Sequence, residues 1–371
     1  MLKYLIIPIF FFAGNLCLAN MASPIQARSY PMSAVSSKDM DILKENIHIK
    51  IDTYFQRAFY KVEYTIQSEK EGFQIPLLFH ARDYYGKFKV WLDGKEVELK
   101  ELTYSERDTT TKFDHFLNSN EKNFTLSKDA LIIRHDKSYQ RIFPLSDFHY
   151  FEVNLSKGIH KIYVEYVGKV WEDNSDWVTE YSFRYFLAPA KEWKSFHELN
   201  LTIDDSEFDQ PIRSNLGPPD SGSFKGTSSW KFSKIPADYI QVTFSPKATG
   251  FAKFLIDIGP LIIAIVFILI LLITHILMIW YSRKYSKDLL AKVIIIGGSL
   301  IFPLFILMSF GFAYLFIDYA IGSYASGYHA GGYAFLLTYL YVILMPLYWI
   351  GMHNLGKAHK KYFAAKKSKM T

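Results

Sequence analysis

The chain has 371 residues, half of them hydrophobic, and a formal net charge of +6. The charge is unevenly placed: the part from Phe251 to the end holds 11 Lys and Arg against three Asp, a net charge of +8, which leaves −2 for the first 250 residues. Binding to nucleic acid needs a concentrated basic surface. The nearly neutral first part therefore argues against nucleic acid as a partner.

The first residues have the pattern of a signal peptide. Lys3 supplies the positive start, Leu5 to Ala13 the apolar stretch, and Cys17-Leu18-Ala19 the small residues before a cleavage site. We predict a signal peptide at 1–19, with an uncleaved anchor helix as the alternative, followed by a flexible lead-in at 20–40. Because Cys17 is the only cysteine, the mature chain would form no internal disulfide and hold no cysteine-based metal site or nucleophile.

The next region alternates apolar and polar side chains with a period of two, which is typical of half-buried strands. The apolar positions include Ile47, Ile49, Ile51, Tyr60, Val62, Tyr64, Ile66, Ile75, Leu77 and Phe79. Similar short runs recur as far as residue 244, with turn residues between them. This pattern indicates an all-β extracytoplasmic domain of one or two antiparallel β-sandwiches, a first unit at 41–168 and a second unit or a continuation at 169–250.

The strongest local prediction is a β-hairpin from Phe88 to Leu99. Asp93-Gly94 favours a two-residue turn. That turn would pair Val90 with Val97 and Phe88 with Leu99 on one face, and Lys89 with Glu98 on the other.

An α-helical membrane domain is expected at 251–355. Three apolar stretches, at about 254–281, 293–317 and 334–352, are each long enough to cross the roughly 30 Å apolar core of a bilayer. Lys and Arg follow the first stretch and fill the tail at 356–371. Because cytoplasmic segments carry excess positive charge, three transmembrane helices would leave the amino-terminal domain outside and the carboxyl terminus in the cytoplasm. We therefore expect a multi-pass protein of the bacterial inner membrane with a periplasmic domain.

Aromatic and acidic residues gather between 171 and 193, and they form a candidate ligand-binding site. The candidates are Trp171, Asp173, Asp176, Trp177 and Trp193. Aromatic faces beside carboxylates suit sugar rings or a protein interface. The alternatives are ordinary packing of the aromatic rings in a sandwich and a solvated acidic turn.

Four residues at or within the expected spans are further candidates: Asp257, His275, Asp318 and His329. Ionisable side chains inside a membrane are functional candidates, although a neutral His275 hydrogen-bonded to a neighbouring helix is an equally simple interpretation. The Tyr- and Gly-rich loop at 321–333 fits either an aromatic belt or a docking surface for a partner or for the protein's own β-domain.

Known catalytic motifs and metal-ligand spacings are not found in the sequence, so we predict no cofactor, no metal and no assigned catalytic residue. The leading hypothesis is a non-catalytic binding or assembly component of an envelope complex, with a membrane-protein partner or a second copy. A glycan- or lipid-binding sensor is the alternative. A third hypothesis, an envelope hydrolase or transferase, requires two or more of a small set of residues to converge in a cleft. That set is His80, His135, His149, Asp173 and Asp176.

Overall fold

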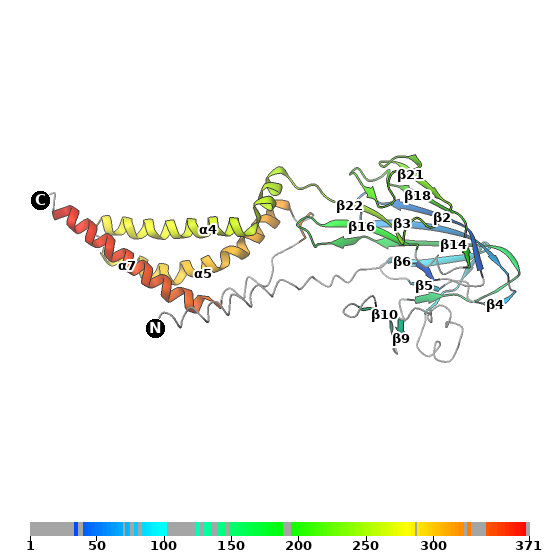
Figure 1. Ribbon diagram of the computed structural model, residues 1–371, viewed down its shortest axis with the longest axis horizontal. Helices are drawn as coiled ribbons and strands as arrows, with labels where there is room; N and C mark the ends of the chain where they lie inside the picture. Colours follow the sequence, from blue (N-terminus) through cyan, green and yellow to red (C-terminus); the bar gives the residue numbers. More distant parts are fainter. Residues whose placement is uncertain are drawn as a thin grey trace. The chain divides into compact units, whose positions relative to one another are not determined.

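The computed structural model has a large β-rich region followed by helices (Figure 1). It describes residues 33–35, 40–69, 71–74, 78–80, 84–101, 124–126, 130–134, 140–144, 148–187, 194–285, 288–322, 325–327 and 339–368. The signal peptide at 1–19, Trp193, His135 and His329 lie outside these residues. Compactness divides the chain into two units. A sandwich unit ends at Ser245 and a helical unit begins at Pro246, but residues 174–179 belong to the helical unit.

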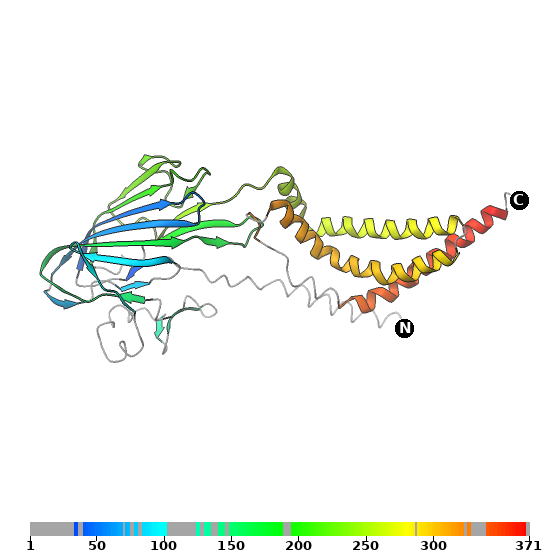
Figure 2. The ribbon, with the colours of Figure 1, turned by 180° about the vertical axis from the view of Figure 1, so that it is seen from behind.

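One sheet of nine strands forms the larger layer of the sandwich unit (Figure 2). Its order is β20 (Ser221–Gly222), β21 (Thr227–Phe232), β18 (Leu199–Asp204), β2 (Met40–Ile51), β3 (Arg57–Ser68), β14 (Gly158–Lys169), β6 (Tyr84–Leu92) and β7 (Lys95–Val97), with β17 (Ser195–Phe196) also on β2. The predicted strands around Ile49 and Val62 lie within β2 and β3. The expected purely antiparallel arrangement is wrong at one place: β18 and β17 pair with β2 in parallel.

The second layer is a sheet of four strands, and three small sheets accompany the two layers. The second layer contains β15 (Trp171–Asp173), β16 (Glu180–Phe186), β22 (Tyr239–Phe244) and β19 (Arg213–Ser214). The small sheets contain β1 (Ser33–Val35), β5 (Leu78–His80), β12 (Phe148–Tyr150) and β8 (Lys100–Glu101); β11 (Gln140–Pro144), β10 (Ala130–Arg134) and β9 (Phe124–Leu126); and β13 (Val153–Leu155) and β4 (Gly72–Gln74). Strand β1 falls inside the lead-in that we expected to be flexible, where it pairs with β5.

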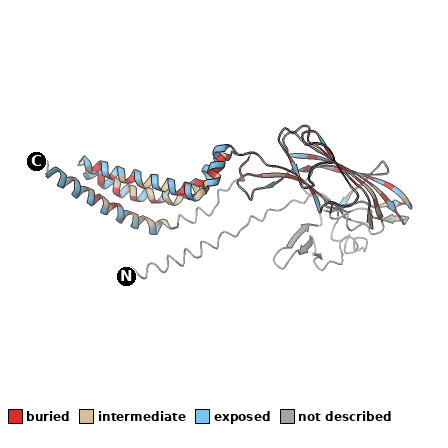
Figure 3. Cartoon of the chain, turned by 45° about the horizontal axis from the view of Figure 1, so that its top comes forward, coloured by how far each residue is buried: buried red, intermediate tan, exposed pale blue. Residues whose placement is uncertain are grey.

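The hydrophobic core lies between the two layers. Alternate residues of β2, β3 and β14 are buried, and they pack with residues of β16 and β22 in one continuous cluster (Figure 3). At one end of the core, Phe55 packs against Phe183, with ring centroids 4.8 Å apart, and against Phe208 at 5.0 Å. Strands from both sides of residue 168 therefore share one core.

The predicted hairpin is present. Asp93 and Gly94 both have positive φ, +48° and +81°, as a two-residue turn requires, and Val90 pairs with Val97. Strand β7 ends at Val97, so the two further pairs that we predicted are not part of the ladder. The turn is fixed to β14, because Oδ1 of Asp93 accepts the N–H of Lys161 at 2.8 Å and Oδ2 bonds Nδ1 of His160 at 2.7 Å.

Helices α4 (Gly250–Lys284), α5 (Asp288–Ile321) and α7 (Tyr341–Ser368) make up most of the helical unit, and α5 lies against both others (Figure 1). Among the described residues, α4 and α5 are long and apolar enough to cross a membrane. The third span that we expected, at about 334–352, is not among the described helices that are long and apolar enough to cross a membrane. Residues 334–338 lie outside the described residues, and α7 turns basic after its first turns.

Helix α4 contains a break at Gly259, which has a φ of +78°. Pro260 disfavours helical geometry in the residue before it, and glycine accepts the positive φ that results. The break separates a short segment, 250–258, from a straight segment, 260–284, that is about 37 Å long at about 1.5 Å per residue. The straight segment alone has the length of a membrane span, so the short segment is available for contacts at one end of the helices.

Candidate functional site

Residues 174–179, which we call the strap, connect β15 to β16 but fold with the helical unit. The N–H of Thr179 donates to the carbonyl of Ala325 at 2.8 Å, and the N–H of Gly327 donates to the carbonyl of Trp177 at 3.3 Å. Val178 and Ser326 face each other between these bonds as an antiparallel bridge. The strap is therefore bonded by its backbone to the segment that follows α5.

Side chains of the strap complete a hydrophobic cluster, which we call the outer seam. The ring of Trp177 lies 5.3 Å from that of Tyr314, and Val178 packs on the same cluster. The buried members of the outer seam are Ala252, Leu255, Ile263, Ala264, Ala313, Ile317, Ile321 and Ala325. Since they come from the first part of α4, the last turns of α5 and the segment after it, the strap is held by apolar packing as well as by backbone bonds.

A buried carboxylate fixes the segment after α5. Asp318 is 6% exposed, and the hydroxyl of Ser326 donates to its Oδ1 at 2.6 Å. A negative charge in the last turn of a helix is unfavourable toward the helix dipole, so hydrogen bonding to the carboxylate has a stabilising role. Gly322, with a φ of +94°, ends α5 and turns the chain back toward the strap. Asp318 thus fixes the segment that contributes Ala325 to the outer seam, the same cluster on which Trp177 packs.

The predicted aromatic–acidic site is divided between the two units. Trp171 and Asp173 lie on β15 in the sandwich unit, whereas Asp176 and Trp177 belong to the strap. Trp171 is only 7% exposed, and the guanidinium of Arg184 lies 3.7 Å from its ring centre. Asp176 is exposed. Both described Trp rings contact other side chains, Trp171 the guanidinium of Arg184 and Trp177 the ring of Tyr314.

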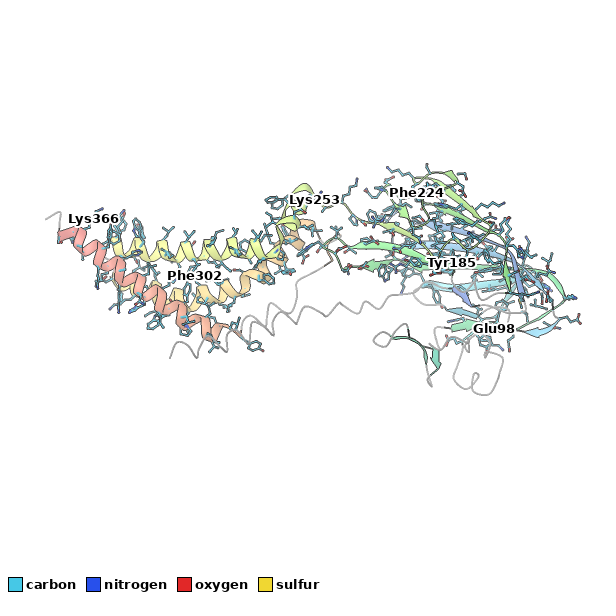
Figure 4. The ribbon with its side chains drawn as sticks, in the orientation of Figure 1. Glu98, Tyr185, Phe224, Lys253, Phe302 and Lys366 are labelled. Atoms are coloured by element: carbon cyan, nitrogen blue, oxygen red, sulfur yellow. The ribbon has the colours of Figure 1, made fainter. Side chains whose placement is uncertain are left out.

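His275 joins three helices. Its Nε2 bonds the carbonyl of Ile294 on α5 at 3.1 Å, and its Nδ1 bonds the hydroxyl of Tyr348 on α7 at 2.9 Å. Because the carbonyl can only accept, Nε2 carries a proton. The ring also stacks on Phe302 at 4.6 Å, and Figure 4 labels Phe302 within the helical unit. His275 is therefore hydrogen-bonded to both neighbouring helices.

Asp257 has different surroundings from Asp318. It lies on the exposed side of the first segment of α4, whereas Asp318 is buried. The two acidic candidates at the ends of the spans therefore differ in burial.

The sequence did not reveal a buried carboxylate in the sandwich core. The pairing of β2 with β3 shifts between Ile42 and Lys44, so Ile42 and Glu45 both face the core although they are three positions apart, and Glu45 is 2% exposed. The hydroxyl of Tyr185, which is labelled in Figure 4, donates to Glu45 at 2.7 Å. A hydroxyl has one proton, so Tyr185 accepts from Tyr64, 2.6 Å away.

Burial raises the pKa of Glu45 to about 7, against the hydrogen bond from Tyr185 and the nearby hydroxyl of Tyr64, which both favour the carboxylate. No cation is among the groups that act on Glu45. One signal in the sequence could have found it. Glu45 has the same parity as Ile47, Ile49 and Ile51, so extending the alternation by one step places it on the buried face.

The structure describes four of the five residues of the hydrolase hypothesis, namely His80, His149, Asp173 and Asp176. His80 is the last residue of β5, and His149 lies on the neighbouring strand β12 of the same small sheet. Asp176 belongs to the other unit. Among the described residues, no group of three or more His, Cys, Asp or Glu side chains is arranged to hold a metal ion.

Comparisons with known proteins give only distant structural likenesses. No protein-family model matches the chain, and no curated protein matches its sequence. Solved structures that resemble it include a candidate nutrient-binding protein from Legionella pneumophila, with 13% identity, a TM-score of 0.35, and coverage of 57% of this chain and 69% of that one. Another is leukotriene A4 hydrolase from Saccharomyces cerevisiae, with 12% identity, a TM-score of 0.34, and coverage of 60% and 32%.

A zinc metallopeptidase from Deinococcus radiodurans also matches, with 8% identity, a TM-score of 0.26, and coverage of 56% of this chain and 43% of that one. The match spans about a third of the yeast hydrolase and less than half of the peptidase. Likenesses at these TM-scores assign no activity to the chain.

Proposed function

We propose that the chain is a non-catalytic binding or assembly component of a bacterial envelope complex, anchored in the inner membrane by its helices. In this proposal the sandwich unit is periplasmic, the carboxyl terminus is cytoplasmic, and residues 334–352 supply a third span. The observation that carries the proposal is the strap. A simple membrane anchor needs one covalent connection, whereas here the chain passes between the units three times, after Asp173, after Thr179 and after Ser245.

The strap supplies a physical means of coupling the sandwich unit to the helical unit. Its backbone bonds to Ala325 and Gly327 and the packing of Trp177 resist separation of the strap from the outer seam. Force on β15 or β16 from a partner bound to the sandwich unit is therefore passed to α5 through hydrogen bonds as well as through the covalent chain. The same coupling is compatible with the sensor hypothesis, in which a ligand replaces the partner.

Crosslinking and affinity purification of the full chain from native membranes in mild detergent tests the proposal. We expect a membrane-protein partner or a second copy of the chain to co-purify. Recovery of a lone monomer, with no crosslinked product in the membrane, would contradict it. A Trp177→Ala variant that still inserts but retains less of the partner would connect the strap to assembly.

An engineered disulfide tests the strap geometry directly. Val178 and Ser326 form a non-hydrogen-bonded antiparallel pair, the arrangement that brings Cα atoms within about 4.5 Å and side chains close together. In a Cys17→Ser background, Val178→Cys with Ser326→Cys is expected to form a disulfide in most molecules under mild oxidation, because the geometry suits one. Non-reducing electrophoresis after protease cleavage between the two positions measures it.

Val178→Cys with Tyr319→Cys is the matched control, because Tyr319 on α5 is 86% exposed. It should remain largely reduced. Equal oxidation of both pairs would mean that the strap is not held against Ser326.

A further inference from the structure

Two cations face each other on the outer side of the nine-stranded sheet. Arg57, at the start of β3, is paired in register with Lys169, at the end of β14. Both are exposed, and they lie over the ring of Tyr85 at 4.7 Å and 5.0 Å from its centroid. Like charges directly opposite one another destabilise a sheet. In the described part of the chain, no ion pair joins either cation to a carboxylate.

Exposed apolar side chains lie beside the two cations. Val167 is paired with both Phe59 and Tyr85, so the three share one row on the outer face. Phe59 is 42% exposed and Tyr85 is 39% exposed, and Tyr54, at the turn between β2 and β3, is 72% exposed. We call Tyr54, Arg57, Phe59, Tyr85 and Lys169 the exit rim. It combines uncompensated positive charge with solvent-exposed aromatic rings.

The exit rim lies at the end of the sheet from which the chain leaves the sandwich unit. Strand β14 ends at Lys169, β15 follows at once, and the strap begins after Asp173. The N–H of Val170 donates to the carbonyl of Gln56, which fixes the β2–β3 turn to this end of β14. The nearby carboxylate of Asp52 already accepts the N–H groups of Gln56 and Arg57 within the turn.

We propose that the exit rim binds the anionic headgroups of membrane phospholipids. Two adjacent cations complement the headgroup phosphates, and tyrosine and phenylalanine rings favour the interface between headgroups and acyl chains. This occupant is favoured over a soluble anion because a soluble anion would leave the row of Phe59, Val167 and Tyr85 facing water. The inference rests on insertion of α4 and α5 in a membrane, as the proposed function does, and it needs no protein partner.

A fluorescence experiment on the full chain tests the inference. Thr53→Cys, in a Cys17→Ser background, carries an environment-sensitive fluorophore at the exposed β2–β3 turn. The labelled chain is placed in nanodiscs of phosphatidylcholine alone or with about a third phosphatidylglycerol. A cation near an anionic surface contributes about fivefold to binding. We therefore expect a blue shift of the fluorescence only in nanodiscs that contain phosphatidylglycerol. In the variant Arg57→Gln/Lys169→Gln, the ratio of membrane-bound to solvent-exposed label should fall roughly thirtyfold.

Lys95→Gln/Lys157→Gln is the matched control, since it removes the same charge at the opposite end of β6 and β14. It should keep the blue shift, and so should Arg57→Lys/Lys169→Arg. An equal shift in both lipids, an equal loss in the control, or a shift produced by inorganic phosphate in neutral nanodiscs would overturn the inference. A chain that enters no nanodisc at all would instead contradict the membrane anchoring, so the two failures are distinguishable.

Discussion

Replacing Glu45 with Gln is expected to remove a pH dependence of about 3 kcal/mol from the stability of the sandwich unit, since each unit of pKa shift corresponds to about 1.4 kcal/mol. Burial raises the pKa of Glu45 from 4.5 to about 7, so the native state holds this proton more tightly than the unfolded state. The stabilisation is therefore complete below about pH 4.5 and is lost as the pH rises through about 7. Gln keeps the shape of the side chain and cannot ionise. The free energy of unfolding of the variant minus that of wild type should therefore be larger at pH 8 than at pH 4.5.

Hydrogen exchange of peptides from β2 and β3, measured in the full chain and corrected for intrinsic rates, reports this opening free energy. Burial lowers the pKa of His48, whereas the Asp93 carboxylate raises the pKa of His160 against the effect of burial. Their contributions cancel in the difference between the variant and wild type. Glu63→Gln on the outer face of β3 is the control, with little change expected. Parallel pH profiles for wild type and Glu45→Gln would show that Glu45 is not the titrating group.

A methyl group at position 298 is expected to destabilise the helical unit by about 2–4 kcal/mol, the combined cost of overpacking and of hydrogen bonds lost between helices. A Cβ there would lie 2.2 Å from Nε2 of His275, so the imidazole must move. Moving it breaks the bonds to Ile294 and Tyr348, which connect α4 with α5 and α7.

The neighbouring residue is an exact positional control, because a Cβ at Gly297 meets nothing within 4 Å. Gly297→Ala and Gly298→Ala add the same methyl group one residue apart in α5. Denaturation by SDS added to mild-detergent micelles, followed by tryptophan fluorescence, gives the stability of each. In a His275→Ala background the penalty of Gly298→Ala should largely disappear, since the clash has gone. A penalty unchanged by His275→Ala would place its cause elsewhere.

Local patterns were sufficient for the individual elements. The alternation from Ile47 to Ile66 predicts β2 and β3, and Asp93-Gly94 predicts the hairpin, because each depends only on neighbouring side chains and on the allowed backbone angles. The uncharged stretches predict α4 and α5 for the same reason. The basic second half of α7 is just as visible in the sequence, and it is why the described part of that helix does not qualify as a span.

Contacts between residues far apart in the sequence could be found only from the tertiary structure. The inward position of Glu45 matters only because Tyr185, 140 residues away, lies across the core to bond it. Trp177 belongs to an acidic, aromatic stretch by sequence, and only the pairing of the strap with Ala325 and Ser326 assigns it to a different unit from Trp171. Periodicity determines which face of a strand is apolar. Which distant face it meets depends on loop closure and on the packing of the whole chain, and neither is recorded in a window of neighbouring residues.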